Sequence, residues 1–216
     1  MEFYQFVRKI SHRPSLVEEG IEILRRAWSG EPVNFEGKRF TVGDFKITPQ
    51  PKTAPKLLLG GMAPPAIDRA ARIADGFLCT GGIGMDTYVD CLAANGKSPE
   101  EGNIILGCWA IIAEDPEAEA AIVGDHVLYQ SNEYIRWGAF GPPDQTPLFP
   151  DSRTAIENGL YELWDADMAV EKLSGMIEQY PQISDIHFWA QFPGEGIETG
   201  NRRMAYIAEK VLPRLR

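Results

Sequence analysis

The sequence has few cysteines and no long apolar run. Its three cysteines, Cys79, Cys91 and Cys108, lack metal-ligand spacing, and an odd number of thiols among apolar neighbours is typical of a reducing cytosol. No apolar stretch approaches the roughly 18 residues that span a membrane. Residues 1–5 lack the basic start and apolar core of a signal peptide. We therefore expect a cytoplasmic protein without a metal site.

Positive charge is also scarce. The chain has 21 Lys and Arg residues against 31 Asp and Glu residues, a formal net charge of −10. Nucleic acids and anionic membranes bind basic surfaces, so this balance argues against both as partners. The charge does not exclude a small-molecule ligand, because a few local cations can bind an anion on an acidic protein.

Familiar catalytic signatures are missing as well. The sequence contains no Ser-His-Asp signature, no Gly-x-x-x-x-Gly-Lys-Ser/Thr loop and no His-Glu-x-x-His helix. Its carboxylates fall mainly on the polar faces of expected helices or at helix caps. The sequence therefore names no catalytic residue.

What is present is enough for a sizeable core. The chain has 216 residues, 44% of them hydrophobic, and we expect one domain over residues 1–216. The clearest helix is expected over residues 15–28, where apolar residues recur at a spacing near 3.6. Ser15 and Glu18 form a capping-box pattern at its start, and Gly30 with Pro32 ends it.

Strands then alternate with helices. A hairpin is expected over residues 33–42 with Gly37 at its turn, followed by a proline-rich connector. Residues 56–60 are nearly all apolar, which is typical of a strand buried on both faces. Later strands are expected at 77–80, 104–113 and 186–192, and helices at 64–74, 86–94, 167–180 and 201–212. Residues 116–137 are expected to form a helix or a helix pair, and residues 138–158 a long loop. This order predicts an α/β fold whose four βα units form a small open parallel sheet or half of a (β/α)8 barrel; periodicity leaves both open.

Two glycine turns stand where expected strands end and helices begin. Their residues are Gly60, Gly61 and Met62 in the first turn and Thr80, Gly81 and Gly82 in the second. Ligands bind at this edge of parallel α/β folds, and glycine lets backbone amides approach an anion. We expect both turns to contact a phosphate-bearing cofactor or substrate. The alternative is that Gly60 and Gly61 serve a tight turn that needs positive φ, and that Thr80 merely ends a strand.

Other candidates are less specific. His187 and Trp189 share one face of the last expected strand, and Tyr129 lies on the third crossover, so we regard all three as candidates for a substrate pocket. The alternative is that they are ordinary core residues, because a lone histidine or a helical aromatic residue is more often buried than functional. Asp75, which precedes a glycine at a helix-to-strand turn, is expected to bond nearby backbone amides rather than act in catalysis.

An ordered series of motifs covers nearly the whole chain. The series consists of residues 18–30 (EEGIEILRRAWSG), 35–40 (FEGKRF), 49–51 (PQP), 59–61 (LGG), 69–77 (RAARIADGF) and 208–216 (AEKVLPRLR). This series resembles the bacterial luciferase-like monooxygenase family. Each motif alone is weak, but their order is fairly specific.

The resemblance implies a (β/α)8 TIM barrel in which FMN or coenzyme F-420 oxidises or reduces a small organic substrate, with the cofactor placed against the Gly60-Gly61 turn. The chain looks like the C-terminal half of such a barrel, without the first four strands. We expect a homodimer, or a partner that supplies the missing half-barrel. The alternatives are a non-catalytic half-barrel and an α/β anion-binding module without redox activity.

The second glycine turn carries a finer resemblance. Residues 75–80 are similar to the corresponding stretch of F-420-dependent sugar-phosphate dehydrogenases, in which the threonine and a lysine three positions later help to hold the substrate phosphate. Here Thr80 is present, but the later position is Ile83. The missing cation argues against a sugar-phosphate substrate.

Overall fold

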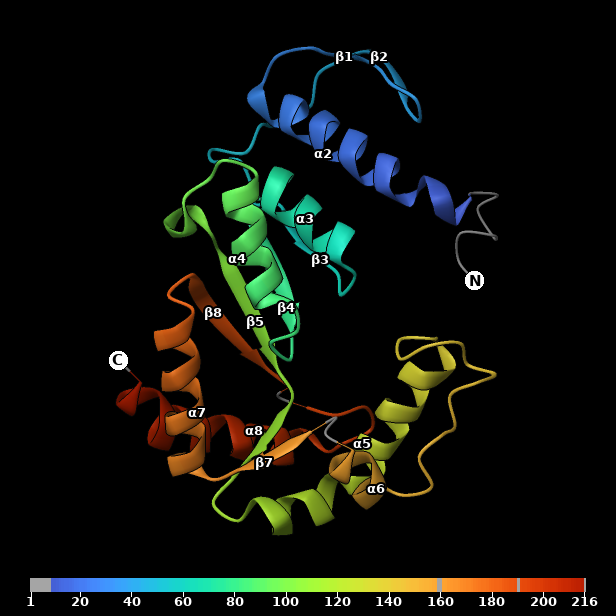
Figure 1. The fold of residues 1–216 in the computed structure, drawn as a ribbon. Helices are drawn as coiled ribbons and strands as arrows, with labels where there is room; N and C mark the ends of the chain where they lie inside the picture. Colours follow the sequence, from blue (N-terminus) through green and yellow to red (C-terminus); the bar gives the residue numbers. More distant parts are fainter. Residues whose placement is uncertain (1–8, 159–160, 190, 216) are drawn as a thin grey trace. The chain divides into compact units, whose positions relative to one another are not determined.

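The computed structural model describes residues 9–158, 161–189 and 191–215 and divides the chain into two compact units (Figure 1). Unit 1 contains the residues up to Cys79 together with Ile83–Ile104, and unit 2 contains Thr80–Gly82 and the residues from Ile105 onward. No helix in the described part of the chain is long and apolar enough to cross a membrane.

Unit 1 begins with the short 3-10 helix η1 (Ile10–His12) and the long helix α2 (Arg13–Ser29). The expected helix is confirmed, and Gly30 ends it with a left-handed φ of 87°. The expected capping box is wrong, because the helix starts before Ser15. The Ser15 hydroxyl donates to the His12 carbonyl oxygen at 3.0 Å, whereas Glu18 accepts from Arg69 and Arg72.

The predicted hairpin is also confirmed. Strands β1 (Val33–Glu36) and β2 (Thr41–Phe45) pair antiparallel, and Ala27 of α2 packs with Val33 and Phe35 in a small core. The carboxylate of Glu19 on α2 accepts hydrogen bonds from three successive backbone amides of residues 38–40. These bonds hold the hairpin turn on the helix.

In the parallel part of unit 1, strands alternate with helices. The order is β3 (Leu58–Gly60), α3 (Pro64–Ile73), β4 (Gly76–Thr80), α4 (Met85–Ala94) and the 3-10 helix η2 (Pro99–Glu101), and β3 pairs parallel with β4. Phe77 is buried and stacks on Tyr88 of α4 with ring centroids 5.2 Å apart. Leu58 and Leu78 share the opposite face and are 38% and 43% exposed. The expectation of burial on both faces is therefore wrong, because the helices of unit 1 cover only one face of this strand pair.

Unit 2 carries the remaining strands and helices. They are β5 (Ile104–Cys108), β6 (Ala110–Ile112), α5 (Pro116–Arg136), α6 (Ser152–Glu157), β7 (Glu162–Trp164), α7 (Ala166–Gln179), β8 (Ile183–Phe188), α8 (Ile197–Tyr206), the π-helical turn η3 (Ile207–Val211) and the 3-10 turn η4 (Leu212–Arg214). Strand β5 neighbours β8, and β6 pairs parallel with β7. A core of apolar residues from α5, β6 and the 161–192 region, including Tyr161 and Phe192, lies beneath α5.

Several boundaries in unit 2 differ from expectation. The single strand expected over 104–113 is two strands that separate at Trp109, and β7 was not expected at all. The expected loop over 138–158 contains the short helix α6. The last strand ends at Phe188 instead of residue 192, so Trp189 follows the strand rather than belonging to it. The alternation of strands and helices is nevertheless that of the predicted α/β fold.

Candidate functional site

The first glycine turn joins β3 to α3. Gly60 lies opposite Leu78 in the parallel register, and a Cβ atom on Gly60 would stand 3.1 Å from the Leu78 carbonyl oxygen. A Cβ atom on Gly61 would stand 2.6 Å from the Cβ atom of Ala66. Neither glycine has a positive φ. Close packing against the helix and the neighbouring strand, rather than turn strain, therefore requires glycine here.

The amide groups around this turn decide where an anion could bind. Pro64 and Pro65 open α3 and carry no amide hydrogen, while the Ala66 amide donates to the Ala63 carbonyl oxygen at 2.8 Å. The first turn of the helix therefore offers no free donor. The amides of Met62 and Ala63 donate to no acceptor in the part of the chain that the structure describes. An anion at this turn would bind to these two amides, which precede the helix.

The second glycine turn follows β4. Gly81 and Gly82 have φ values of 59° and 77°, so the chain uses glycine here for positive φ. The Gly81 amide donates to the Gly107 carbonyl oxygen of β5 at 2.7 Å. A Cβ atom on Gly81 would meet nothing within 4 Å, and Thr80 is exposed. The turn is thus held beside β5 and leaves open space on its other side.

Aromatic rings gather at the ends of two neighbouring strands of unit 2. Trp109 directly follows β5 and Trp189 directly follows β8, and their ring centroids lie 6.0 Å apart in an edge-to-face arrangement. Trp109 also contacts Tyr134 of α5 at 5.5 Å and Tyr161 at 5.2 Å. Since ligands bind at the carboxyl ends of parallel strands in barrel-type folds, this group is a candidate pocket wall.

The other predicted pocket residues do not join this group. His187 lies exposed on β8, and Tyr129 is 56% exposed on α5. Neither stacks on another ring within the described residues. Sequence reasoning missed Trp109, although a tryptophan two residues after Gly107 in a buried apolar run was an available signal of a strand end.

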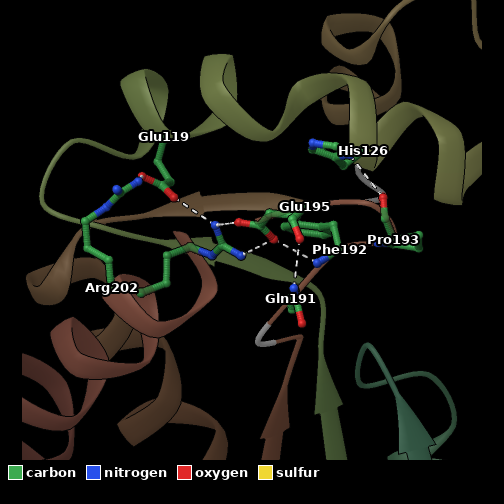
Figure 2. A network of polar contacts seen from close by, with 8 residues as sticks. Glu119, His126, Gln191, Phe192, Pro193, Glu195 and Arg202 are labelled. Atoms are coloured by element: carbon green, nitrogen blue, oxygen red, sulfur yellow. Dashed lines mark hydrogen bonds and ion pairs between the residues drawn. The ribbon is translucent and has the colours of Figure 1, made fainter. Parts of the chain in front are cut away.

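A buried ionic network holds the segment that follows Trp189 (Figure 2). Arg203 of α8 donates to both carboxylate oxygens of Glu195 at 2.6 and 2.7 Å, and to Glu119 of α5 at 2.8 Å. Arg202 donates to the second oxygen of Glu119 at 2.7 Å. The Phe192 amide donates to Glu195 at 2.8 Å. The network ties α5, α8 and the loop between β8 and α8 together, and sequence reasoning did not find it.

The electrostatics of this network are balanced. Two arginines face two glutamates, and Arg203, Glu195 and Glu119 are all buried. Burial acts to raise the pKa of Glu195, but the hydrogen bonds from Arg203 and the Phe192 amide outweigh it, and the net pKa lies below the ordinary value. Arg203 also lies over the Phe192 ring, 5.2 Å from its centroid. The arrangement positions a loop, and each of its four charged side chains is in an ion pair.

Two further expectations concern the role of Asp75 and metal binding. The Asp75 carboxylate accepts from the Leu57 amide at 2.8 Å and from Arg25 at 2.8 Å, which confirms its structural role. Among residues 9–158, 161–189 and 191–215, no three His, Cys, Asp or Glu side chains come together as metal ligands would.

The elements of the two units define an α/β protein with glycine turns and aromatic residues at strand ends. A model of the luciferase-like monooxygenase family matches residues 2–170. The chain therefore belongs to the luciferase-like monooxygenase family.

Individual relatives are distant. The F-420-dependent glucose-6-phosphate dehydrogenase of Nakamurella multipartita is 24% identical over 225 residues, which cover 93% of this chain and 60% of the relative. The monooxygenase RslO1 from Streptomyces bottropensis has a TM-score of 0.73 at 21% identity, covering 98% of this chain and 64% of that chain. The oxygenating constituent of 3,6-diketocamphane monooxygenase from Pseudomonas putida, solved with FMN, has a TM-score of 0.65 at 15% identity, covering 94% and 64%. The chain thus spans less than two-thirds of the length of these proteins, and the structural similarity shows a shared fold.

Proposed function

We propose that this chain is the cofactor-binding part of a redox enzyme that uses coenzyme F-420 or FMN to oxidise or reduce a small organic substrate. Family membership supports redox chemistry. The Nakamurella multipartita relative is named for F-420, and the Pseudomonas putida enzyme was solved with FMN. The observation that carries the proposal is the first glycine turn, where two amides without partners follow two glycines packed against their neighbours.

Each group then has a limited task. The amides of Met62 and Ala63 bind an anionic group of the cofactor, and Gly61 keeps the turn close to α3. The bound cofactor supplies the hydride-transfer chemistry, while the protein binds it, orients it and excludes water.

Titration of the purified chain with FMN and with F-420, followed by absorbance, tests the proposal. We expect saturable binding of one of them. Gly61→Ala should weaken that binding, because the added Cβ atom would stand 2.6 Å from Ala66 and displace the turn. The matched control is Gly20→Ala in α2, where a Cβ atom would meet nothing within 4 Å. Failure of both cofactors to bind would refute the proposal.

A second candidate concerns assembly. We infer that the chain works as a homodimer or with a partner that supplies further βα units. The alternative to the redox enzyme is a non-catalytic half-barrel or an anion-binding module that assembles in the same way. The supporting observation is the exposed face that β3 and β4 share, on which Leu58 and Leu78 lie. Light scattering of the isolated chain tests this inference. A monodisperse monomer with two-state unfolding would contradict it, and a yellow, flavin-containing preparation would contradict the anion-binding module.

We also propose that the protein acts in the cytosol. Cys79, Cys91 and Cys108 form no disulfide bond within the described residues, and Cys79 and Cys108 are buried. This state is typical of reducing compartments. Thiol titration of freshly isolated, unfolded protein should find all three groups reduced, and an oxidised population would count against the proposal.

A further inference from the structure

A continuous row of aromatic rings runs from the strand ends of unit 2 to the end of α5. Its members, named here the aromatic row, are Trp189, Trp109, Tyr134, Trp137 and Phe140. The ring centroids lie 6.0 Å apart from Trp189 to Trp109, 5.5 Å from Trp109 to Tyr134, and 5.6 and 6.5 Å from Tyr134 to Trp137 and Phe140. Each contact is tilted or edge-to-face, the geometry that aromatic pairs prefer.

Much of this row faces outward. Trp189, Trp137 and Phe140 are 36%, 72% and 44% exposed. Rings that are fixed by neighbours yet open on one side are suited to binding another ring, because little side-chain freedom remains to be lost. The second glycine turn is held to β5, the strand that Trp109 follows, by the hydrogen bond from the Gly81 amide to the Gly107 carbonyl oxygen.

Charge restricts what such a row can bind. Residues 1–104 contain equal numbers of acidic and basic side chains, whereas residues 105–216 contain 8 Lys and Arg against 18 Asp and Glu. Every arginine described in unit 2 is in an ion pair. Arg136, the cation next to Trp137 in the chain, pairs with Glu133. An anionic substrate would therefore meet net negative charge with no free guanidinium to compensate it.

We propose that the aromatic row binds a neutral, planar aromatic compound, which is the substrate class of the redox reaction. The inference deepens the proposed function and rests on it, because the bound compound is a substrate only if the chain is part of a redox enzyme. The bound ring stacks against the exposed rings of the row, and its neutrality follows from the net negative charge of residues 105–216. A sugar phosphate lacks the flat apolar face and carries the wrong charge.

The experiment compares 2-naphthalenemethanol with its phosphate ester by isothermal titration calorimetry, because the two ligands share one ring and differ in charge. 1-Decanol serves as the flexible apolar comparison. We expect the naphthyl alcohol to bind at least about tenfold more tightly than the phosphate ester, a difference within reach of electrostatic repulsion alone. It should also bind more tightly than decanol. Equal or tighter binding of the ester, tighter binding of decanol, or no binding would each overturn the proposal.

Substitutions in the aromatic row test whether its rings bind the naphthyl alcohol. Trp189→Leu and Trp137→Leu should each weaken binding of the naphthyl alcohol about fivefold or more, the loss expected for one ring-stacking contact. Trp189→Phe should retain most of it. Trp28→Phe in unit 1 is the matched control and should change nothing. Trp137 is 72% exposed, so its removal leaves no core cavity and keeps the test valid if Trp189→Leu fails to fold. Unchanged binding in the Leu variants would overturn the proposal.

The outcome is separable from that of the cofactor titration. A chain that binds neither FMN nor F-420 but prefers the naphthyl alcohol would refute the cofactor proposal and keep the ring-binding site. A chain that binds a cofactor and prefers the phosphate ester would keep the redox proposal and refute the substrate class.

Discussion

At the scale of single residues, the charges of unit 2 are buried only where partners match them. Arg203 meets Glu195 through two parallel hydrogen bonds and Glu119 through a third. Such bidentate pairs are the strongest ionic contacts in proteins. A buried charge that loses its partner is costly, whereas an exposed pair contributes little.

We predict that Arg203→Met destabilises the chain strongly. The change leaves Glu195 and Glu119 buried without Arg203 and should lower the free energy of unfolding by about 3–5 kcal/mol. Arg153→Met is the matched control, because Arg153 pairs with Glu157 on the surface and should leave the free energy of unfolding essentially unchanged. Urea unfolding measures both. Equal effects of the two variants would contradict the prediction.

The same network predicts a dependence on pH. The pKa of Glu195 is lowered in the folded chain, so its contribution to stability is complete above the unfolded-state value near 4.5. The contribution is lost as the pH falls through the lower, folded-state pKa. The urea midpoint should therefore decrease below about pH 4.5. Glu195→Gln should flatten this part of the profile, while Glu178→Gln, exposed on α7, should leave it intact. An unchanged slope in Glu195→Gln would refute the assignment.

At the scale of elements, α5 organises unit 2. Asn132 is buried on this helix and forms two hydrogen bonds with the backbone of Phe149, one from its side-chain nitrogen at 3.1 Å and one to its side-chain oxygen at 2.9 Å. The Tyr161 hydroxyl donates to Gln130 on the same helix at 3.2 Å, and burial raises the pKa of Tyr161. The helix thus holds both the long 138–151 connection and the core tyrosine.

Asn132→Ala should release the 138–151 connection from α5. Loss of both bonds leaves the Phe149 backbone groups without partners and should cost about 1–3 kcal/mol. Hydrogen exchange is expected to accelerate at the Phe149 amide and its neighbours. Asn201→Ala, exposed on α8, should leave exchange there unchanged. Protection at Phe149 equal to that of the unmodified chain would show that other contacts hold the connection.

At the scale of the whole molecule, charge is unevenly distributed. The net charge of −10 arises entirely within residues 105–216. Like charges concentrated in one part of a chain repel one another and destabilise its compact state, and dissolved salt screens this repulsion.

We therefore predict that salt stabilises unit 2. The thermal midpoint should rise as NaCl increases from about 0.01 M to about 0.2 M, a range over which the screening length falls below the size of the unit. The double variant Glu171→Gln/Glu178→Gln removes two exposed charges of α7 and should show a smaller rise. A midpoint that falls with salt would indicate that attractive ion pairs outweigh the repulsion.

Much of the fold could be predicted from sequence pattern. The 3.6-residue periodicity over residues 15–28 predicted α2, and Gly37 predicted the hairpin. The prolines at positions 64 and 65 marked the start of α3 correctly. The split at Trp109 was missed, because residues 104–113 read as one apolar run and nothing local reveals a change of strand partner. β7 is three residues long and carries too short a pattern to be recognised.

The candidate site, like the fold, could be predicted from the sequence only in part. The glycine turns at Gly60-Gly61 and Gly81-Gly82 were visible in the sequence, because glycine is favoured where the backbone packs closely or adopts a positive φ. The first turn shows close packing and the second shows positive φ. Trp189 was predicted as a pocket candidate on the last strand, but its partner Trp109 was not, since an aromatic contact between distant residues leaves no spacing to detect.

Most of the order of strands and helices, both glycine turns and the family motifs were determined by the sequence alone, because periodicity, turn chemistry and motif order are properties of neighbouring residues. Only the tertiary structure decided which rings form the aromatic row and which charges are buried together. Glu119 and Arg203 are 84 residues apart in the chain, and packing of α5, α8 and the loop after β8 brings them within 2.8 Å. Contacts between distant elements depend on how whole helices and strands pack, and no local pattern encodes that arrangement.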